Sequence, residues 1–361
     1  MHKGYLVLQN GRVFSGERFG APGEARAELV FATGMVGYIE TLTDPSYHGQ
    51  MVAFTFPLIG NYGVIPEDFE GAPARLSACI VREAALTPSN FRSQARLHEY
   101  LAESGVVALQ GIDTRALTKL LREEGEMNAA ILDSLPSDME AFTRELAAFS
   151  IRADVYAVTC PAPYALGETG RHAVLWDFGL KRTMVRALTE RGLRVTVMPA
   201  NSSADDILRL APDGVLLSGG PGDPAAHPEI LREIARVSEA RMPLMGVCLG
   251  HQMLSLARGA KCIRLKYGHR GGNQPVRRKA DGRLFTTSQN HSYAVSSEGL
   301  PEGASISYEN VNDRTCEGLD YRDIPAFSVQ FYPEAPAGPL NTSFLFDRFI
   351  GMMGGRAHAA V

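Results

Sequence analysis

The chain has 361 residues, of which 45% are hydrophobic and 21% charged, a balance typical of a globular protein with room for two domains of about 150 residues each. Lys and Arg total 36 against 40 for Asp and Glu, and the resulting net charge of −4 argues against a nucleic-acid binder driven by overall charge. The five cysteines include no C-x-x-C pair, which fits a reducing compartment better than a disulfide framework.

The sequence also predicts a cytoplasmic protein with no membrane partner. The N-terminal stretch MHKGYLVLQNGRVF has too short an apolar run for a signal peptide. No segment approaches the roughly 18 consecutive apolar residues of a membrane helix. The short basic run at 277–279 is better explained as a solvated turn than as a phosphate site.

Residues 1–150 are predicted to form a β-rich mixed N-terminal domain. Asn10-Gly11 lies between two short β-type runs and indicates a hairpin. Asp113 or Thr114 is a plausible N-cap for a helix. Ser46 and His48 share a loop, but nothing nearby completes a catalytic triad. The predicted strands and helices are residues 5–8, 12–14, 28–33 and 51–56, then 91–104 and 114–124.

Prolines and glycines at 151–170 predict a linker, and the pattern changes after it. Strands then alternate with helices, which indicates βαβ units and a parallel sheet. The second domain, residues 171–355, is therefore predicted to be a doubly wound, mostly parallel α/β domain, and parallel pairing is expected only there. Its predicted strands are 172–176, 194–198 and 214–217, with helices at 181–191, 204–210, 228–238 and 343–352.

The stretch MPLMGVCLGHQMLSLAR at 242–258 is predicted to be a strand, a tight turn and a helix. Gly246, Cys248 and Gly250 form a G-x-C-x-G turn, the thiol counterpart of the G-x-S-x-G nucleophile elbow. Glycines on both sides allow the sharp bend. Cys248 then lies at a helix N-terminus, where the backbone dipole favours thiolate. We interpret Cys248 as a nucleophile rather than a buried structural cysteine.

Three further stretches contribute candidate site residues. SGGPGDP at 218–224 follows a strand, and one of its N–H groups could form an oxyanion hole with the N–H of Leu249. Taken alone, this stretch is equally well explained as a simple βα turn. QNHSY at 289–293 is a polar patch suited to a polar substrate. QFYPE at 330–334 also follows a strand.

Together these motifs resemble the class I, or triad-type, glutamine amidotransferases, whose nucleophile motif matches GVCLGHQ at 246–252 and whose glycine loop matches GGPGDP at 219–224. The resemblance narrows to the small, glutamine-hydrolysing subunit of carbamoyl-phosphate synthetase and spans nearly the whole chain. The segments that narrow it are TGMVGYIETLTDPSYHGQ at 33–50, FPLIGNYGV at 56–64, KYGHRGGNQPV at 266–276, SQNHSYAV at 288–295 and PEAPAGPLNTSFLFDRF at 333–349.

The resemblance implies that Cys248 attacks the side-chain amide carbon of L-glutamine, forming a glutamyl thioester that water hydrolyses. The N–H groups of Gly220 and Leu249 match the oxyanion donors, and Glu334 matches the triad carboxylate. Ser292 stands where the family usually has glycine. The positions that match glutamine-binding residues are Ser46, Gly220, Gly222, Leu249, Gln252, Asn290, Ser292 and Tyr293.

The resemblance also implies a partner, the large subunit of carbamoyl-phosphate synthetase, which receives the ammonia and makes carbamoyl phosphate from bicarbonate and ATP. No G-x-x-x-x-G-K-[ST] loop occurs in this chain. ATP and magnesium are therefore expected only in the large subunit, and no cofactor or metal is expected in this chain. The resemblance leaves open whether the pathway leads to arginine or to pyrimidines.

One departure from the family pattern is chemically large, because Tyr332 occupies the place of the general-base histidine. Imidazole titrates near pH 6.5, whereas a phenol titrates near 10, so a neutral phenol is a poor base at pH 7. His251, one helical turn after Cys248, and His291 in the polar patch are alternative bases. The more common role for His251 would be packing or substrate contact.

Two functional hypotheses follow. The first is a glutaminase subunit whose turnover is slowed by Tyr332, favoured by Cys248 and the glutamine-binding loops. The second is a non-catalytic partner that stabilises an ammonia-fed synthetase, favoured by Tyr332. A third, the amidotransferase of anthranilate or guanylate synthesis, is disfavoured because those glutaminase domains lack this front domain.

Overall fold

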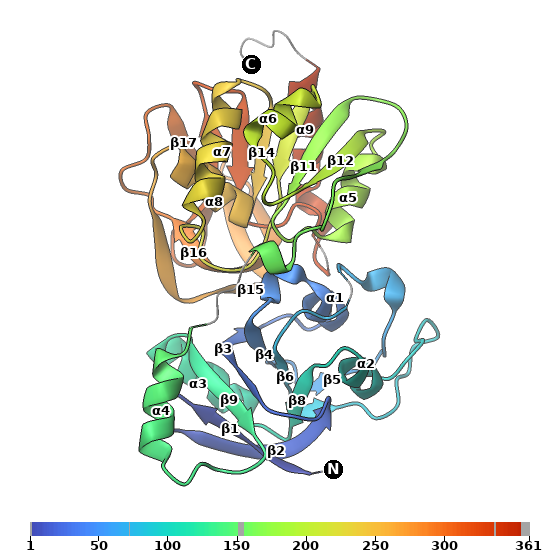
Figure 1. Ribbon diagram of the computed structural model, residues 1–361, viewed down its shortest axis with the longest axis vertical. Helices are drawn as coiled ribbons and strands as arrows, with labels where there is room; N and C mark the ends of the chain where they lie inside the picture. The colour runs from blue at the N-terminus through green and yellow to red at the C-terminus, as the bar shows by residue number, and fades with distance from the viewer. Residues whose placement is uncertain (1, 72, 151–154, 336, 355–361) are drawn as a thin grey trace. The chain divides into compact units, whose positions relative to one another are not determined.

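The computed structural model describes residues 2–71, 73–150, 155–335 and 337–354. It divides the chain into two compact units (Figure 1). The first unit is Met1–Ala153 together with Lys266–Gly271, and the second is Asp154–Leu265 together with Gly272–Val361. The sequence predicts one boundary at 151–170, so the return of the chain to the first unit at Lys266–Gly271 is a difference from that expectation.

The described part of the first unit contains a closed barrel in the order β1-β2-β8-β6-β4-β3-β9. The predicted hairpin is confirmed, since β1 and β2 pair antiparallel. The pairs β3–β4, β4–β6 and β6–β8 are parallel, which corrects the expectation that parallel pairing is confined to the second domain. The barrel strands are β1 (Lys3–Leu8), β2 (Val13–Gly20), β3 (Ala25–Ala32), β4 (Gln50–Phe54), β6 (Ala78–Ile80), β8 (Val107–Gln110) and β9 (Met127–Leu132).

Barrel strand β4 is buried on both faces. Met51 and Ala53 pack in one core with helix α3 (Thr114–Glu124), whereas Val52 and Phe54 pack in another core. Two-sided burial explains why this strand is a continuous apolar run instead of an alternating one. The other core includes residues of α1 (Tyr38–Thr43) and α2 (Leu97–Glu103), and a smaller cluster holds Leu146 of α4 (Met139–Ala148).

The helix predicted at 91–104 begins later, at Leu97. The Asn90 side chain accepts a hydrogen bond from the Arg92 N–H, which closes a local turn, and Phe91 is 97% exposed. The Arg96 N–H donates to the Glu99 side chain, and this contact marks the true helix start. The remaining short elements of the first unit are β5 (Leu58–Ile59), β7 (Glu83–Ala84), η1 (Pro45–Tyr47) and η2 (Pro66–Asp68).

The second unit is built on a ten-stranded sheet in the order β10-β12-β11-β13-β14-β19-β18-β16-β15-β17. The pairs in the run β12-β11-β13-β14-β19 are parallel, whereas β10–β12, β18–β19, β16–β18, β15–β17 and β17–β18 are antiparallel, so the sheet is mixed and not mostly parallel as predicted. The mixed α/β class of the chain is confirmed. The strands are β10 (Tyr164–Leu166), β11 (His172–Asp177), β12 (Arg194–Pro199), β13 (Gly214–Leu217), β14 (Leu244–Val247), β15 (Cys262–Arg278), β16 (Leu284–Val295), β17 (Ala304–Asn310), β18 (Cys316–Tyr321) and β19 (Ala326–Val329).

Helices cover both faces of the parallel run (Figure 1). One core joins alternate strand residues to α6, α7 and α8, and the other joins the intervening residues to α5 and α9. On β11, for example, Val174 and Trp176 enter the first core while Ala173 and Leu175 enter the second. The helices are α5 (Arg182–Thr189), α6 (Ala204–Arg209), α7 (Pro228–Glu239), α8 (Leu249–Ala257) and α9 (Phe344–Met353), with η3 (Val155–Ala157) and η4 (Leu340–Thr342).

The predicted linker at 151–170 is only partly a connection. Residues 151–154 lie outside the described residues. Val155 is fully buried in a core of the second unit. Strand β10 pairs antiparallel with β12 and forms an end of the sheet. Prolines and glycines at 161–170 therefore flank a short edge strand, a position where prolines are tolerated.

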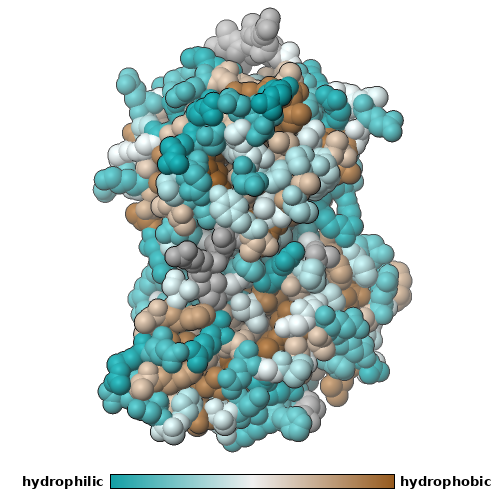
Figure 2. Space-filling model, viewed as in Figure 1, coloured by the Kyte–Doolittle hydropathy of each residue, from teal (hydrophilic) through white to brown (hydrophobic). Residues whose placement is uncertain are grey.

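The visible face of each unit in Figure 2 is largely hydrophilic, with apolar residues scattered between polar ones. This agrees with apolar side chains being collected in the internal cores. Every helix in the described ranges is too short or too polar to cross a lipid bilayer.

Candidate functional site

Cys248 occupies the turn between β14 and α8, at the carboxyl end of the parallel run. Its φ of 52° and ψ of −107° lie in a region that residues with a side chain seldom adopt. A Cβ on Gly246 would lie 2.8 Å from the Gly250 carbonyl oxygen, and one on Gly250 would lie 2.4 Å from that of Leu217. Glycine is therefore required on both sides of the turn, and the predicted strand–turn–helix elbow is confirmed.

The glycine loop after β13 lies against the same turn. A Cβ on Gly220 would lie 2.1 Å from the Phe178 carbonyl oxygen and 2.8 Å from a methyl carbon of Leu249. Leu249 is the first residue of α8, so its N–H has no partner within the helix. The two proposed oxyanion donors thus belong to neighbouring residues. Gly222, farther along the loop, is exposed and has a φ of 92°.

Tyr332 lies directly beside Cys248. The Cys248 Sγ lies 3.6 Å from the Tyr332 Oη and 3.5 Å from the Asn290 carbonyl oxygen. The Tyr332 hydroxyl donates to that same carbonyl over 3.2 Å. Cys248 and Tyr332 are each 2% exposed. The structure therefore brings the thiol, the phenol and the backbone of β16 into one buried contact.

Glu334 pairs with a residue that the sequence analysis did not select, Lys181. The Lys181 Nζ lies 3.0 Å from Glu334 Oε1, and both side chains are at most 1% exposed. The same ammonium lies over the ring of Tyr332, 2.7 Å from its centroid, a cation–π arrangement. Lys181, Tyr332 and Glu334 consequently form one buried cluster next to Cys248.

The turn after β11 places Lys181. One carboxylate oxygen of Asp177 accepts hydrogen bonds from the N–H groups of Gly179 and Leu180, and the other accepts from Cys160. Burial raises the pKa of Asp177, and these N–H groups oppose the rise. Lys181 follows the carboxyl end of a central parallel strand, where α/β folds place their sites, and that position is the signal that could have selected it.

The polar patch predicted at 289–293 lies on β16, where Asn290, His291 and Ser292 are buried. Gln252, on α8, donates to the Tyr293 carbonyl over 2.7 Å and to Gln330 Oε1 over 3.0 Å. The structure therefore brings Gln252 and the polar patch together, while their binding of glutamine stays a prediction. Gln330 is a further buried member that the sequence analysis did not single out.

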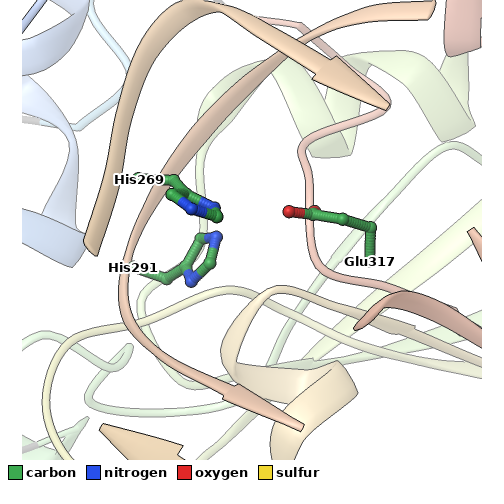
Figure 3. Close-up of side chains that lie close together, drawn as sticks. All are labelled: His269, His291 and Glu317. Carbon is green, nitrogen blue, oxygen red and sulfur yellow. The ribbon is translucent and has the colours of Figure 1, made fainter. Parts of the chain in front are cut away.

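His291 and Glu317, two possible metal ligands, are linked by an amide. His291 Nε2 contacts Gln289 Oε1 at 3.0 Å, and Gln289 Nε2 donates to Glu317 over 2.9 Å. Asn310 donates to the other oxygen of Glu317. Figure 3 labels His291 and Glu317 of the second unit, and also His269, which belongs to the first unit. Each oxygen of the buried Glu317 carboxylate thus accepts a hydrogen bond from a side-chain amide.

Ser46 belongs to the first unit, in η1, where the Asp44 side chain accepts a hydrogen bond from its N–H over 2.8 Å. Its contribution to a glutamine site stays a prediction, as do the substrate contacts of the other predicted binding positions.

His251, proposed as an alternative base, is fully buried with Nδ1 2.7 Å from the Ser328 hydroxyl. Burial lowers its pKa to about 3, so its ring is neutral at pH 7 and a weak base. The structure thus favours the packing role for His251. His291 is engaged on both ring nitrogens by Tyr293 and Gln289.

We expect His251 to make the second unit sensitive to acid. The unfolded state takes up the proton near pH 6.5, whereas the folded state resists it until about pH 3. The stabilisation is therefore complete above pH 6.5 and is lost as the pH falls, by about 2 kcal/mol between pH 6.5 and pH 5.

Urea unfolding at several pH values, followed by the fluorescence of the single tryptophan Trp176, measures this loss. The variant His251→Asn should show a correspondingly smaller fall in the free energy of unfolding with acid. An identical pH dependence in both proteins would contradict the assignment.

Residues 174–352, which hold the elbow and the buried cluster beside it, match the family model of the class-I glutamine amidotransferases. Residues 6–131 match the model of the carbamoyl-phosphate synthase small chain, CPSase domain. The chain belongs to the family of glutamine-hydrolysing carbamoyl-phosphate synthase small chains, as the sequence analysis predicts.

Curated relatives match along nearly their full length. The carbamoyl phosphate synthase small chain of Lactococcus lactis is 44% identical over 353 residues, covering 98% of this chain and 99% of that one. The protein of the same name from Listeria monocytogenes is 45% identical over 358 residues, covering 99% and 98%. Among solved structures, a putative GMP synthase component from Thermoplasma acidophilum overlaps 52% of this chain and 95% of its own, with 20% identity and a TM-score of 0.46.

Proposed function

We propose that the second unit hydrolyses L-glutamine through Cys248. The observation that carries the proposal is the position of this thiol in a strained turn at the N-terminus of α8, where the helix dipole favours thiolate. The sulfur attacks the side-chain amide carbon, ammonia leaves, and water releases glutamate from the thioester. The N–H groups of Gly220 and Leu249 stabilise the oxyanion. The parallel run with helices on both faces is, in this proposal, the doubly wound core of the amidotransferase fold.

Tyr332 makes this turnover slow. The Tyr332 hydroxyl donates to the Asn290 carbonyl, and a carbonyl oxygen only accepts hydrogen bonds, so the phenol holds its own proton and does not take one from Cys248. Neither the carbonyl nor the phenol is an effective base at neutral pH. Ammonia production therefore lacks the assistance that an imidazole would give.

The ammonia is passed, in this proposal, to a large subunit that forms carbamoyl phosphate from bicarbonate and ATP in the cytoplasm. The family membership and the resemblance of the first unit to the small-chain domain support such a partner. ATP and magnesium belong to that partner. The second candidate function, a non-catalytic subunit that stabilises an ammonia-fed synthetase, is favoured by one observation, the phenol in contact with Cys248.

The test is steady-state ammonia release from glutamine by the purified chain, with and without a carbamoyl-phosphate synthase large subunit. Slow release and glutamine-dependent carbamoyl phosphate formation in the complex support the glutaminase. Carbamoyl phosphate formed only with added ammonia supports the non-catalytic subunit. Carbamoyl phosphate made by the isolated chain from ATP and bicarbonate would contradict both.

A further inference from the structure

The amide of Gln252 has an orientation that its neighbours determine. Oxygen and nitrogen of a side-chain amide are distinguished by their hydrogen-bond partners. The Tyr293 backbone carbonyl can only accept, so the Gln252 atom 2.7 Å from it is Nε2. The second N–H of Nε2 donates to Gln330 Oε1 over 3.0 Å. Both donors of Gln252 are therefore used within the protein.

With both N–H groups of its side-chain amide engaged, Gln252 has only the amide oxygen, Oε1, left to bind a ligand. This oxygen accepts no hydrogen bond within the described part of the chain. The Cys248 Sγ lies 3.5 Å from the Asn290 carbonyl, and Gln252 Nε2 contacts the Tyr293 carbonyl farther along the same strand, so the thiol and this amide both line β16. A ligand that lies along this strand with its side-chain amide carbon at Cys248 reaches toward this oxygen. An acceptor there attracts an ammonium group and repels a carboxylate.

Gln330 is itself held firmly in place beside the Gln252 amide. It directly follows β19, its backbone N–H donates to the Glu317 carbonyl over 2.9 Å, and its side chain is fully buried. One hydrogen bond, to the Tyr293 carbonyl, leaves the Gln252 amide plane free to turn, whereas two bonds to separate elements fix it. The Tyr293 carbonyl is itself anchored by His291 Nδ1 at 2.7 Å.

We propose that Gln330 is a positioning residue that fixes the Gln252 amide so that its oxygen receives the α-ammonium group of L-glutamine. The inference rests on the proposed function, because it takes glutamine as the ligand. Through Gln252, Gln330 would give the site its preference for a free amino acid over an analogue that lacks the amino group. Gln330 itself does not touch the substrate.

The experiment compares the binding of L-glutamine and of its desamino analogue glutaramate by isothermal titration calorimetry. The full-length chain carries Cys248→Ala throughout, so that neither ligand is consumed. We expect the parent to prefer glutamine, and Gln330→Met to weaken glutamine binding roughly tenfold, the range of one hydrogen bond to a charged group, while glutaramate binding changes less than twofold. Gln330→Glu keeps an acceptor for Gln252 and should keep the preference.

Equal weakening of both ligands by Gln330→Met, or an unchanged preference for glutamine, would overturn the positioning role while leaving the proposed function intact. A parent chain that binds neither ligand would overturn the proposed function together with this inference. Should Gln330→Met fail to fold, the Gln330→Glu variant decides alone, since loss of the preference in that variant contradicts the proposal.

Discussion

Tyr332→His is expected to raise the rate of glutamine hydrolysis by roughly 10²–10⁴, the usual contribution of general-base assistance. The phenol now contacts the Cys248 sulfur at 3.6 Å without being able to take its proton at neutral pH. An imidazole there would lie between Cys248 and Glu334, whose carboxylate would orient it. The measurement is the rate of ammonia release at saturating glutamine, in the complex with the large subunit, for the Tyr332→His variant and for the parent chain.

Two control variants distinguish an effect of the new imidazole as a base from an effect of the changed side-chain packing. Tyr332→Phe removes only the hydroxyl and should not raise hydrolysis. Cys248→Ala should abolish the gain in the Tyr332→His background and cost little in the parent, where the nucleophile is poorly activated. Synthesis from added ammonia bypasses Cys248 and should be equal in all variants. Rapid hydrolysis by the parent, unchanged by Tyr332→His, would show that another group is the base.

Lys181→Met is expected to destabilise the second unit by about 3–5 kcal/mol, because it leaves the buried carboxylate of Glu334 without its counter-charge. Unfolding by urea, read from the buried Trp176, measures the effect in this unit. The double variant Lys181→Met/Glu334→Gln should recover much of the loss, since it removes both charges together.

The matched control is Arg209→Met in α6, in the same unit as Trp176. Arg209 also forms an ion pair, with Asp206, but these side chains are 73% and 47% exposed. Water screens such a pair, so its removal should change the free energy of unfolding by no more than about 0.5 kcal/mol. A similar small effect for Lys181→Met would mean that the buried pair is dispensable for stability.

Local patterns in the sequence predicted the elbow and the hairpin well. Gly246, Cys248 and Gly250 are close in sequence, and the steric limits that require glycine operate between neighbours. Tyr332 and Glu334 were selected from the sequence, but their neighbour Lys181 was not, because it is about 150 residues from them and meets them only when β11 and β19 join one sheet. Gln330 was overlooked for the same reason, since its partner Gln252 lies on a different element.

The first unit was harder to predict from sequence than the second. Its strands β4, β6 and β8 are short, and the connections between these parallel strands contain loops and short helices in place of the regular alternation seen after residue 171. The predicted helix at 91–104 failed at its start because hydrogen bonds of Asn90 and Arg96 form a turn and a cap that apolar periodicity does not reveal.

The return of Lys266–Gly271 to the first unit bears on how this protein can be dissected genetically. A gene fragment ending near residue 153 would encode the barrel without Arg270, the partner of Glu126 in an ion pair whose side chains are both 1% exposed. The truncated product would carry an uncompensated buried charge and an exposed barrel surface. A fragment starting near residue 154 would carry the complementary segment with nothing to fold against. The two units should therefore be expressed as one polypeptide, because neither fragment carries all the residues of its own unit without a piece of the other.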